Sequence, residues 1–191
     1  MTLKLLRSIN SGDSNVNFSS CCRPSYDLDI VFDPDKRLTL RPATNADSAA
    51  IRELVFGVLA DYGLEPDLDG TDVDLNDIEA NYNGRGGVFE VLMDSTGSIL
   101  GTVGLFPMDE ATIELRKMYF AREIRGRGLG KKLLARMIDK ARNLGYLRVY
   151  LETASVLKQA VHIYEQAGFR PVDVKHTPRC DQGYVLELGT E

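Results

Sequence analysis

The sequence has no tryptophan, and only three cysteines and two histidines occur among its 191 residues. Cys21 and Cys22 are adjacent, and Cys180 lies far from both. An odd and unevenly spaced set of this kind does not form the disulfide framework of a small secreted domain, so we expect a reduced, cytoplasmic setting. No group of Cys, His and carboxylate residues has metal-ligand spacing either, and we therefore expect no metal site.

Long apolar runs and excess positive charge are also missing. No run approaches the roughly 20 apolar residues of a membrane-spanning helix, and residues 1–15 lack the apolar core and cleavage site of a signal peptide. With 23 Lys and Arg residues against 28 Asp and Glu residues, the formal net charge is −5, which argues against a broad nucleic-acid-binding face. We expect neither a membrane nor a nucleic acid as partner.

The apolar residues that are present, 43% of the chain, suffice for one buried core. We predict a poorly specified extension over residues 1–37, in which only YDLDIVF has strand character, and one folded domain over residues 38–191. Hairpin signals come first in this domain and one strand–helix–strand unit follows them. The predicted fold class is therefore mixed α/β.

Periodicity and capping residues predict the elements of the domain. Thr44 and Asp47 resemble a capping box that opens a helix ending near Leu59. The acidic segment 61–79 is turn-rich and leads into a short helix within 75–82. The remaining predicted elements are a hairpin over 87–108 with its turn at 95–98, strands at 37–44, 111–120, 147–153 and 183–189, and helices at 129–144 and 157–168.

The stretch RGRGLGKK, residues 125–132, places glycine at alternate positions between basic residues and runs directly into an amphipathic helix. Gly126, Gly128 and Gly130 remove side chains where the backbone turns tightly or approaches a ligand. The following helix offers unpaired N–H groups and the positive end of its dipole, and the neighbouring arginines and Lys131 add mobile positive charge. This combination predicts a binding site for a phosphorylated ligand.

Two familiar phosphate-binding motifs do not fit this stretch. A Walker A loop has glycine in the place of Arg125, and in the place of Lys132 it has a Ser or Thr hydroxyl for magnesium. The dinucleotide-binding fingerprint has glycine in the place of Leu133. A module for ordinary nucleotides is therefore a poor alternative, because no magnesium ligand accompanies the glycines.

RGRGLG matches the Arg/Gln-x-x-Gly-x-Gly/Ala signature of the GNAT superfamily of N-acetyltransferases, and IELRKMYFAREIRGRGLGKKLL resembles the strand, loop and helix that bind acetyl-CoA in that family. AVHIYEQAGF resembles the second GNAT signature, and LTLRPATNAD resembles the usual first strand and helix start. The resemblance covers about residues 38–191. It implies a mixed, mostly antiparallel central sheet flanked by helices on both faces and splayed between the strands IELRKMYF and LRVYLET.

By this resemblance acetyl-CoA is the co-substrate, and two sets of residues would bind it through their backbones. The pyrophosphate would be held by Arg125, Gly126, Arg127, Gly128, Leu129, Gly130 and Lys131. The pantetheine arm would pair with Met118, Tyr119 and Phe120. The chain departs from the family pattern at Leu157, where members commonly carry an asparagine, and Thr153 or Ser155 are the polar alternatives.

The resemblance also implies two catalytic candidates. Tyr164 occupies the usual acid position, where its phenol would protonate the departing thiolate; the alternative is packing among apolar neighbours. Glu114 stands where some members place the base that takes a proton from the amine; the alternative is a surface ion pair with Arg116. Glu152, acting through a water chain, is the second candidate for the base.

The acceptor is indicated only by charge. Segment 61–79 holds eight acidic residues and no basic one, which is typical of a solvated, mobile loop. In GNAT proteins, however, the corresponding segment often borders the acceptor site, where acidic residues would attract a cationic amine. His176 lies in another loop expected to border this site, whereas His162 is expected to be a solvated surface residue.

The sequence thus indicates an acetyl-CoA-dependent N-acetyltransferase. The acceptor would be a primary amine of a small molecule or of a basic side chain in a peptide, and transfer would be direct, in a ternary complex. The alternative is a catalytically idle acyl-CoA-binding sensor or interaction domain, which the departure at Leu157 leaves open. A homodimer is compatible with the sequence but is not indicated by it.

Overall fold

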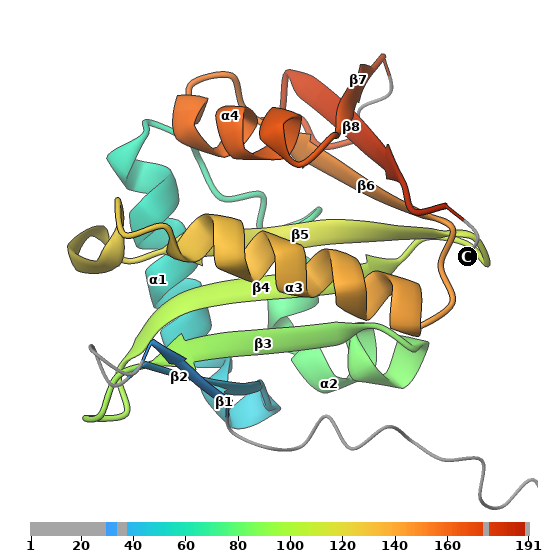
Figure 1. Ribbon diagram of the computed structural model, residues 1–191. Helices are drawn as coiled ribbons and strands as arrows, with labels where there is room; N and C mark the ends of the chain where they lie inside the picture. The colour runs from blue at the N-terminus through green and yellow to red at the C-terminus, as the bar shows by residue number, and fades with distance from the viewer. Residues whose placement is uncertain (1–29, 34–37, 174–175, 190–191) are drawn as a thin grey trace, which may run out of the picture.

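The computed structural model describes residues 30–33, 38–173 and 176–189. These residues form an eight-stranded sheet in the order β1-β2-β3-β4-β5-β6-β8-β7 (Figure 1). The strands are β1 (Ile30–Asp33), β2 (Leu38–Pro42), β3 (Val88–Met93), β4 (Ile99–Pro107), β5 (Thr112–Phe120), β6 (Arg148–Thr153), β7 (Arg170–Val172) and β8 (Gln182–Glu187). β1 belongs to the expected extension, the rest of which lies outside the described residues.

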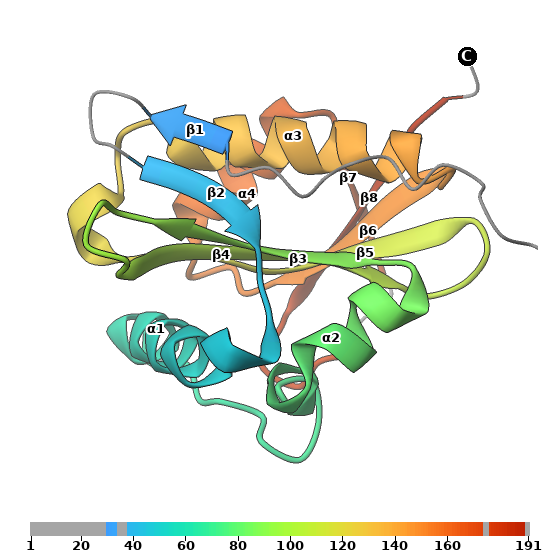
Figure 2. The ribbon, with the colours of Figure 1, turned by 90° about the horizontal axis from the view of Figure 1, so that it is seen from below.

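Helices cover both faces of the sheet (Figure 2). α1 (Ser48–Asp61) and α2 (Ile78–Asn81) lie on one face, and α3 (Leu129–Asn143) and α4 (Lys158–Gln166) lie on the other. Short 3-10 turns connect these elements: η2 (Asn45–Asp47), η3 (Val73–Asn76), η4 (Asn83–Arg85) and η5 (Arg122–Ile124). One buried apolar cluster fills each of the two layers. No helix in the described ranges is both long and apolar enough to cross a membrane.

The sheet splits between β5 and β6. These two strands run parallel and pair at only three positions, from Thr112 opposite Arg148 to Glu114 opposite Tyr150. The other neighbouring strands of the described sheet are antiparallel. Beyond Glu114, β5 continues to Phe120 without β6 as its neighbour. The predicted sheet, mixed, mostly antiparallel and splayed at this point, is confirmed.

A bulge divides β5 into two parts. The pairing register with β4 shifts between Thr102 and Gly104, and opposite this shift Lys117 has a φ of 54°. Among the described residues this is the one non-glycine in the left-handed region. The Thr102 hydroxyl donates a hydrogen bond to the Lys117 carbonyl at 2.6 Å. A bulge of this kind bends its strand and increases the local twist.

Local signals explain most of the elements. The predicted capping box is present between Thr44 and Asp47; it opens the η2 turn, which leads into α1. α3 ends just before Gly145, whose φ of 88° requires glycine. Strand β7 was not predicted, since it has only three residues and contains Pro171. Proline is tolerated there because β7 is the last strand of the sheet.

Candidate active site

A cavity of about 590 Å³ opens where β5 and β6 separate. On the side of α3 and α4 it is lined by the glycine stretch, the start of α3 and α4 itself. The ends of β5 and β6 form its middle, and the end of α1 together with residues 177, 179 and 180 lines the rest. The cavity therefore borders elements from both faces of the sheet.

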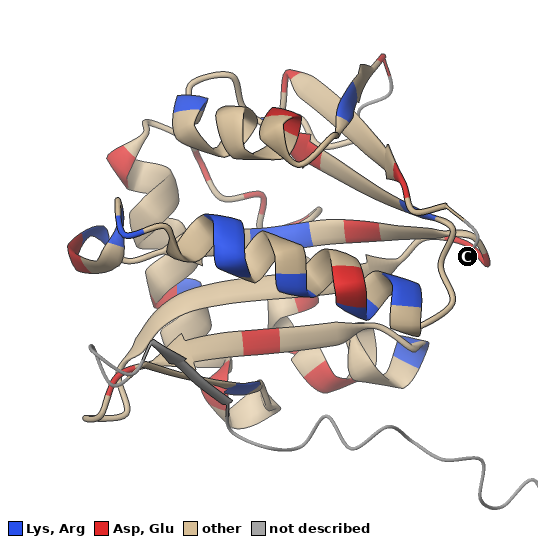
Figure 3. Ribbon diagram, viewed as in Figure 1, with Lys and Arg blue, Asp and Glu red and all other residues tan. Residues whose placement is uncertain are grey.

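The glycine stretch forms an open loop at the start of α3. Gly126 and Gly128 have φ angles of 77° and 74°, in the left-handed region that favours glycine. A Cβ atom at either position would meet nothing within 4 Å, so the space over this backbone is open. Basic residues gather around the loop and along the first turns of α3 (Figure 3). Positive charge, open backbone and a helix N-terminus together suit an anionic ligand.

The cavity and the predicted cofactor-binding set overlap but are not identical. Eight predicted residues line it: Met118, Tyr119, Phe120, Arg125, Gly126, Gly128, Leu129 and Gly130. Arg127 and Lys131 are not among the lining residues. Arg127 is exposed, and Lys131 borders a smaller hollow of about 260 Å³ beside α3 and α4.

The Arg125 side chain makes contacts that the motif does not reveal. Its Nε donates to the Phe120 carbonyl at 2.8 Å, and one terminal nitrogen lies 2.9 Å from the Asp61 carboxylate. Its guanidinium also lies 5.5 Å from the centre of the Tyr62 ring. The expectation of a mobile charge is wrong here, because these contacts tie the loop to the end of β5 and to the end of α1.

Tyr164 both packs in the core and lines the cavity. The residue is 6% exposed, and its ring lies 5.9 Å from the Phe169 ring, centre to centre. Burial raises the pKa of the Tyr164 phenol above its ordinary value, and the nearby Tyr119 and Cys180 raise it further. The phenol therefore keeps its proton at neutral pH.

Glu114 lines the cavity from the first part of β5 and is 5% exposed. Arg116 Nε donates to its Oε2 at 2.7 Å, so the ion pair expected at the surface is in fact largely buried. Burial raises the pKa of Glu114 even though Arg116 opposes this shift. A carboxylate with a raised pKa is a stronger base, because it binds a proton more tightly.

Glu152, the second candidate for the base, is held as an anion. Its carboxylate accepts hydrogen bonds from the Tyr150 hydroxyl at 2.8 Å and from the backbone N–H groups of His176 at 2.6 Å and Thr177 at 2.7 Å. Burial raises the pKa of Glu152, but these hydrogen bonds outweigh burial and lower it. Of the two carboxylates, Glu152 therefore binds a proton less tightly than Glu114.

The two histidines and Cys180 are not further catalytic candidates. His176 is 57% exposed, with Nδ1 2.8 Å from Glu152 Oε1. His162 is exposed as predicted, although it borders the cavity. Cys180 lines the cavity, and burial raises the pKa of its thiol to about 11, so it is neutral at pH 7. Within the described ranges, no three His, Cys, Asp or Glu side chains are grouped to hold a metal ion.

Leu157, the residue that directly precedes α4, lines the cavity. Of the two polar alternatives, Thr153 also lines the cavity. Ser155 does not, and its hydroxyl lies 2.6 Å from the Asp181 carboxylate. Thr153 is thus the better placed to supply a polar contact on this wall.

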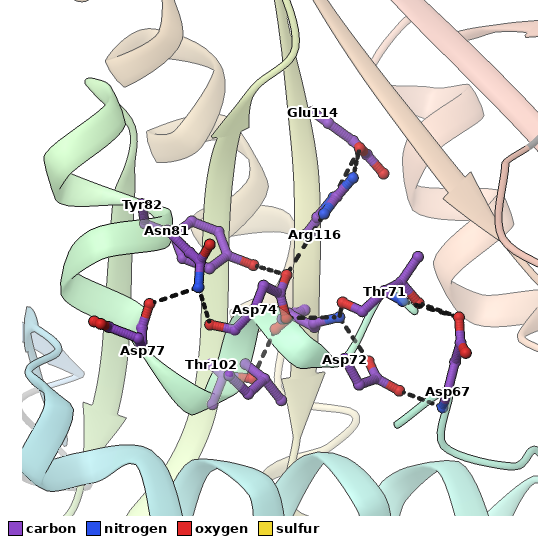
Figure 4. A network of polar contacts seen from close by, with 12 residues as sticks. Asp67, Thr71, Asp72, Asp74, Asp77, Asn81, Tyr82, Thr102, Glu114 and Arg116 are labelled. Carbon is purple, nitrogen blue, oxygen red and sulfur yellow. Dashed lines mark hydrogen bonds and ion pairs between the residues drawn. The ribbon is translucent and has the colours of Figure 1, made fainter. Parts of the chain in front are cut away.

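The acidic segment is not solvated throughout. Asp72 and Asp74 are 2% and 6% exposed. Lys117 Nζ lies 2.6 Å from Asp72 and 3.3 Å from Asp74, and Arg179 also binds Asp72. Figure 4 shows part of this network, including the hydrogen bond from the Tyr82 hydroxyl to Asp74, at 2.6 Å. The expectation of a mobile, uncompensated acidic loop is therefore wrong at these two positions.

Sequence patterns could not pair these residues, because Asp72 lies 45 positions from Lys117 and 107 positions from Arg179. One signal was present. Lys117 lies in the middle of the strand IELRKMYF, and a buried lysine is rarely without a carboxylate partner. Its position in the strand therefore indicated a buried acidic residue nearby.

Comparison with known proteins identifies the family to which the chain belongs. Residues 55–169, more than half of the chain, match the Acetyltransferase (GNAT) family. The chain belongs to the GNAT family. "Uncharacterized N-acetyltransferase YjgM" of Escherichia coli is 38% identical over 143 residues, which are 72% of this chain and 82% of that protein. The family and its relatives together show that this GNAT protein is an N-acetyltransferase.

Solved structures agree with this assignment. A GNAT acetyltransferase of Staphylococcus aureus Mu50 has a TM-score of 0.75 at 24% identity, covering 80% of this chain and 99% of that one, and shows the fold. The yncA protein of Salmonella typhimurium, solved with its cofactor acetyl-CoA, has a TM-score of 0.61 at 26% identity, covering 81% of this chain and 95% of that one. The yncA structure supports acetyl-CoA as the co-substrate, and the open glycine loop beside a split sheet suits such a ligand.

Proposed function

We propose that this GNAT protein transfers an acetyl group from acetyl-CoA directly to a primary amine, on a small molecule or a basic side chain, while both are bound. The observation that supports this most is one cavity that contains the anion-binding loop, Glu114 and Tyr164. Acetyl-CoA supplies the acetyl group and leaves as the CoA thiol. Burial raises the pKa of the Cys180 thiol in this cavity, which disfavours the thiolate that an acetyl-cysteine intermediate would require.

The glycine stretch would hold the pyrophosphate through backbone N–H groups from Gly126 to Gly130. Arg125 already fixes this loop to Phe120 and Asp61, so little order would have to be gained on binding. The end of β5, which has no β6 neighbour, would pair with the pantetheine arm like an added strand. The main-chain groups of Lys117 and Ala121 point toward β4, whereas the Phe120 carbonyl points away from it to Arg125. Since these groups alternate along a strand, Met118 and Phe120 would offer theirs to the pantetheine arm.

Glu114 would take the proton that the amine must lose. A lysine-like amine has a reference pKa of about 10.4, so it is protonated at neutral pH and needs a base. Tyr164 would protonate the departing thiolate, whose thiol has a reference pKa of about 8.5. The raised pKa of Tyr164 keeps the proton in place until the thiolate forms. One residue thus accepts a proton and the other donates one in each cycle.

Calorimetry and a free-thiol assay test this proposal. We expect CoA to bind with a Kd in the micromolar range or tighter, about −8 kcal/mol or stronger, and ATP with magnesium to bind far more weakly. We also expect acetyl-CoA to release thiol with at least one member of a panel of primary amines. Tighter binding of ATP than of CoA would contradict the cofactor. CoA binding without turnover on any amine would support the idle-binder alternative instead.

Glu114→Gln is expected to lower kcat/KM about 100-fold, because the amide cannot accept the amine proton. The base must be ionised, and the pKa of Glu114 is raised above its usual value. Wild-type kcat/KM should therefore rise with pH through this raised pKa and level off above it. Rates measured from about pH 4, near the reference pKa of a glutamate, to about pH 9 should show this acidic limb in wild type and not in the variant.

Glu110→Gln provides the matched control, since Glu110 is exposed and does not line the cavity. It should keep both the rate and the acidic limb. If Glu114→Gln also kept them, Glu114 would not be the base, and Glu152 would be the next residue to examine.

A further inference from the structure

Asp72 joins the two parts of the sheet that β5 and β6 leave separated. Its carboxylate is fully buried, with 0% side-chain exposure. The two terminal nitrogens of Arg179 lie 2.8 Å from Oδ2 and 3.0 Å from Oδ1 of Asp72, which is a two-point ion pair. Asp72 comes from the segment between α1 and α2, whereas Arg179 comes just before β8, on the other side of the split. The pair therefore crosses the opening between the two parts.

Lys117 attaches the same carboxylate to the bulge of β5. Its Nζ lies 2.6 Å from Asp72 Oδ1 and donates to the Thr71 carbonyl at 2.8 Å, and its side chain is only 3% exposed. Asp72 also accepts a hydrogen bond from the backbone N–H of Asp67 at 2.8 Å (Figure 4). Three chain segments that are distant in sequence thus meet at one buried carboxylate.

Part of this cluster lines the cavity, although Asp72 itself does not. Thr71, Lys117, Arg179 and Cys180 all line it, and none of them belongs to the glycine stretch or to α4. Under the proposed function, acetyl-CoA fills the end at the glycine stretch, which leaves the end at Arg179 for the acceptor. Arg179 is 12% exposed, so part of its side chain reaches this space.

We propose that the Asp72–Arg179 ion pair is a clamp across the acceptor end of the cavity, and that Arg179 limits the size of the amine that can enter. The limit on size rests on the proposed function; the clamp itself does not. β5 and β6 pair only from Thr112 to Glu114 and from Arg148 to Tyr150, so the sheet is held together at one end of the split. The clamp holds it at the other end.

The charges around Asp72 decide which residue of the Asp72–Arg179 pair should be substituted. Without Arg179, the Asp72 carboxylate keeps two partners, the Lys117 ammonium that it shares with Asp74 and the backbone N–H of Asp67. Without the Asp72 carboxylate, two cations would lose their shared partner, and such a variant could fail for reasons of stability alone. Arg179→Gln therefore tests the clamp, Arg179→Lys restores a positive charge, and Arg170→Gln is a control at an exposed arginine of β7.

Amide hydrogen exchange, measured by mass spectrometry, tests the clamp without any assay of activity. In Arg179→Gln, peptides covering residues 67–73 and 176–181 should exchange about tenfold faster, while α3 keeps its wild-type rate. Arg179→Lys keeps the charge but not the two-point geometry, so its exchange should lie between that of Arg179→Gln and that of wild type, and Arg170→Gln should match wild type. Unchanged exchange in both peptides of Arg179→Gln would overturn the clamp.

Steady-state kinetics tests the proposed limit on acceptor size. Two acceptors are compared: the best small primary amine of the panel and a lysine side chain in a pentapeptide. We expect Arg179→Gln to raise the kcat/KM for the peptide, divided by the kcat/KM for the small amine, about tenfold. CoA affinity should stay within about twofold of wild type, because the glycine stretch is untouched. Faster exchange with an unchanged acceptor ratio would overturn the role in selection. A wild-type protein that acetylates no amine would overturn the proposed function and this role with it, while the exchange result would still decide the clamp.

Discussion

Gly128→Val is expected to lower CoA affinity at least about 100-fold, which is about 2.7 kcal/mol. Gly128 precedes α3 with a φ of 74°, and a β-branched residue is strained in that region of backbone space. The valine side chain would also occupy the open space over the loop, where no atom now lies within 4 Å of a Cβ position. Strain and lost space act together, so the pyrophosphate site should be lost. Calorimetry with CoA measures the effect.

Lys132→Ala is the control for this experiment. Lys132 is exposed and does not line the cavity, so its removal should change CoA affinity by no more than about twofold. A thermal melt of each variant separates loss of binding from loss of folding. If both substitutions weakened CoA binding equally, charge rather than backbone would hold the ligand, and the role given to the glycine loop would be wrong.

Tyr164→Phe is expected to lower kcat about 100-fold and to leave CoA affinity nearly unchanged. The substitution keeps the ring that packs against Phe169 and removes only the hydroxyl. The loss would therefore fall on the protonation of the departing thiolate and not on the core. Steady-state kinetics with saturating acetyl-CoA, together with calorimetry, distinguishes the two effects.

Tyr184→Phe is the matched control. Tyr184 on β8 is 3% exposed, but it does not line the cavity. Its hydroxyl makes only long contacts, 3.5 Å to Glu165 and 3.4 Å to Gln182, so turnover should stay within about twofold of wild type. Wild-type turnover in Tyr164→Phe would show that Tyr164 is a packing residue and that another group, or water, protonates the thiolate.

Local chemistry made the glycine loop and the helices predictable. The positive φ angles of Gly126 and Gly128, the capping box at Thr44 and the apolar face of α3 each depend on residues a few positions apart. Such contacts form within one element, so their residues appear in the sequence at characteristic spacings. The two family motifs depend on the same kind of local pattern, and for that reason they identified the family and the fold.

Tertiary structure alone decided the state of the charged residues. The resemblance to GNAT proteins suggested Glu114 as the base, but only packing shows that burial raises its pKa while hydrogen bonds lower that of Glu152. Asp72 looked like one more residue of an acidic loop, yet it is buried between Lys117 and Arg179. Burial and ion pairing depend on segments that are far apart in the chain and that meet only when the sheet forms. The sequence by itself therefore determined the family and the fold and predicted a loop for an anionic ligand. Only the folded chain showed which of the two carboxylates has a raised pKa and that Asp72 is buried in ion pairs.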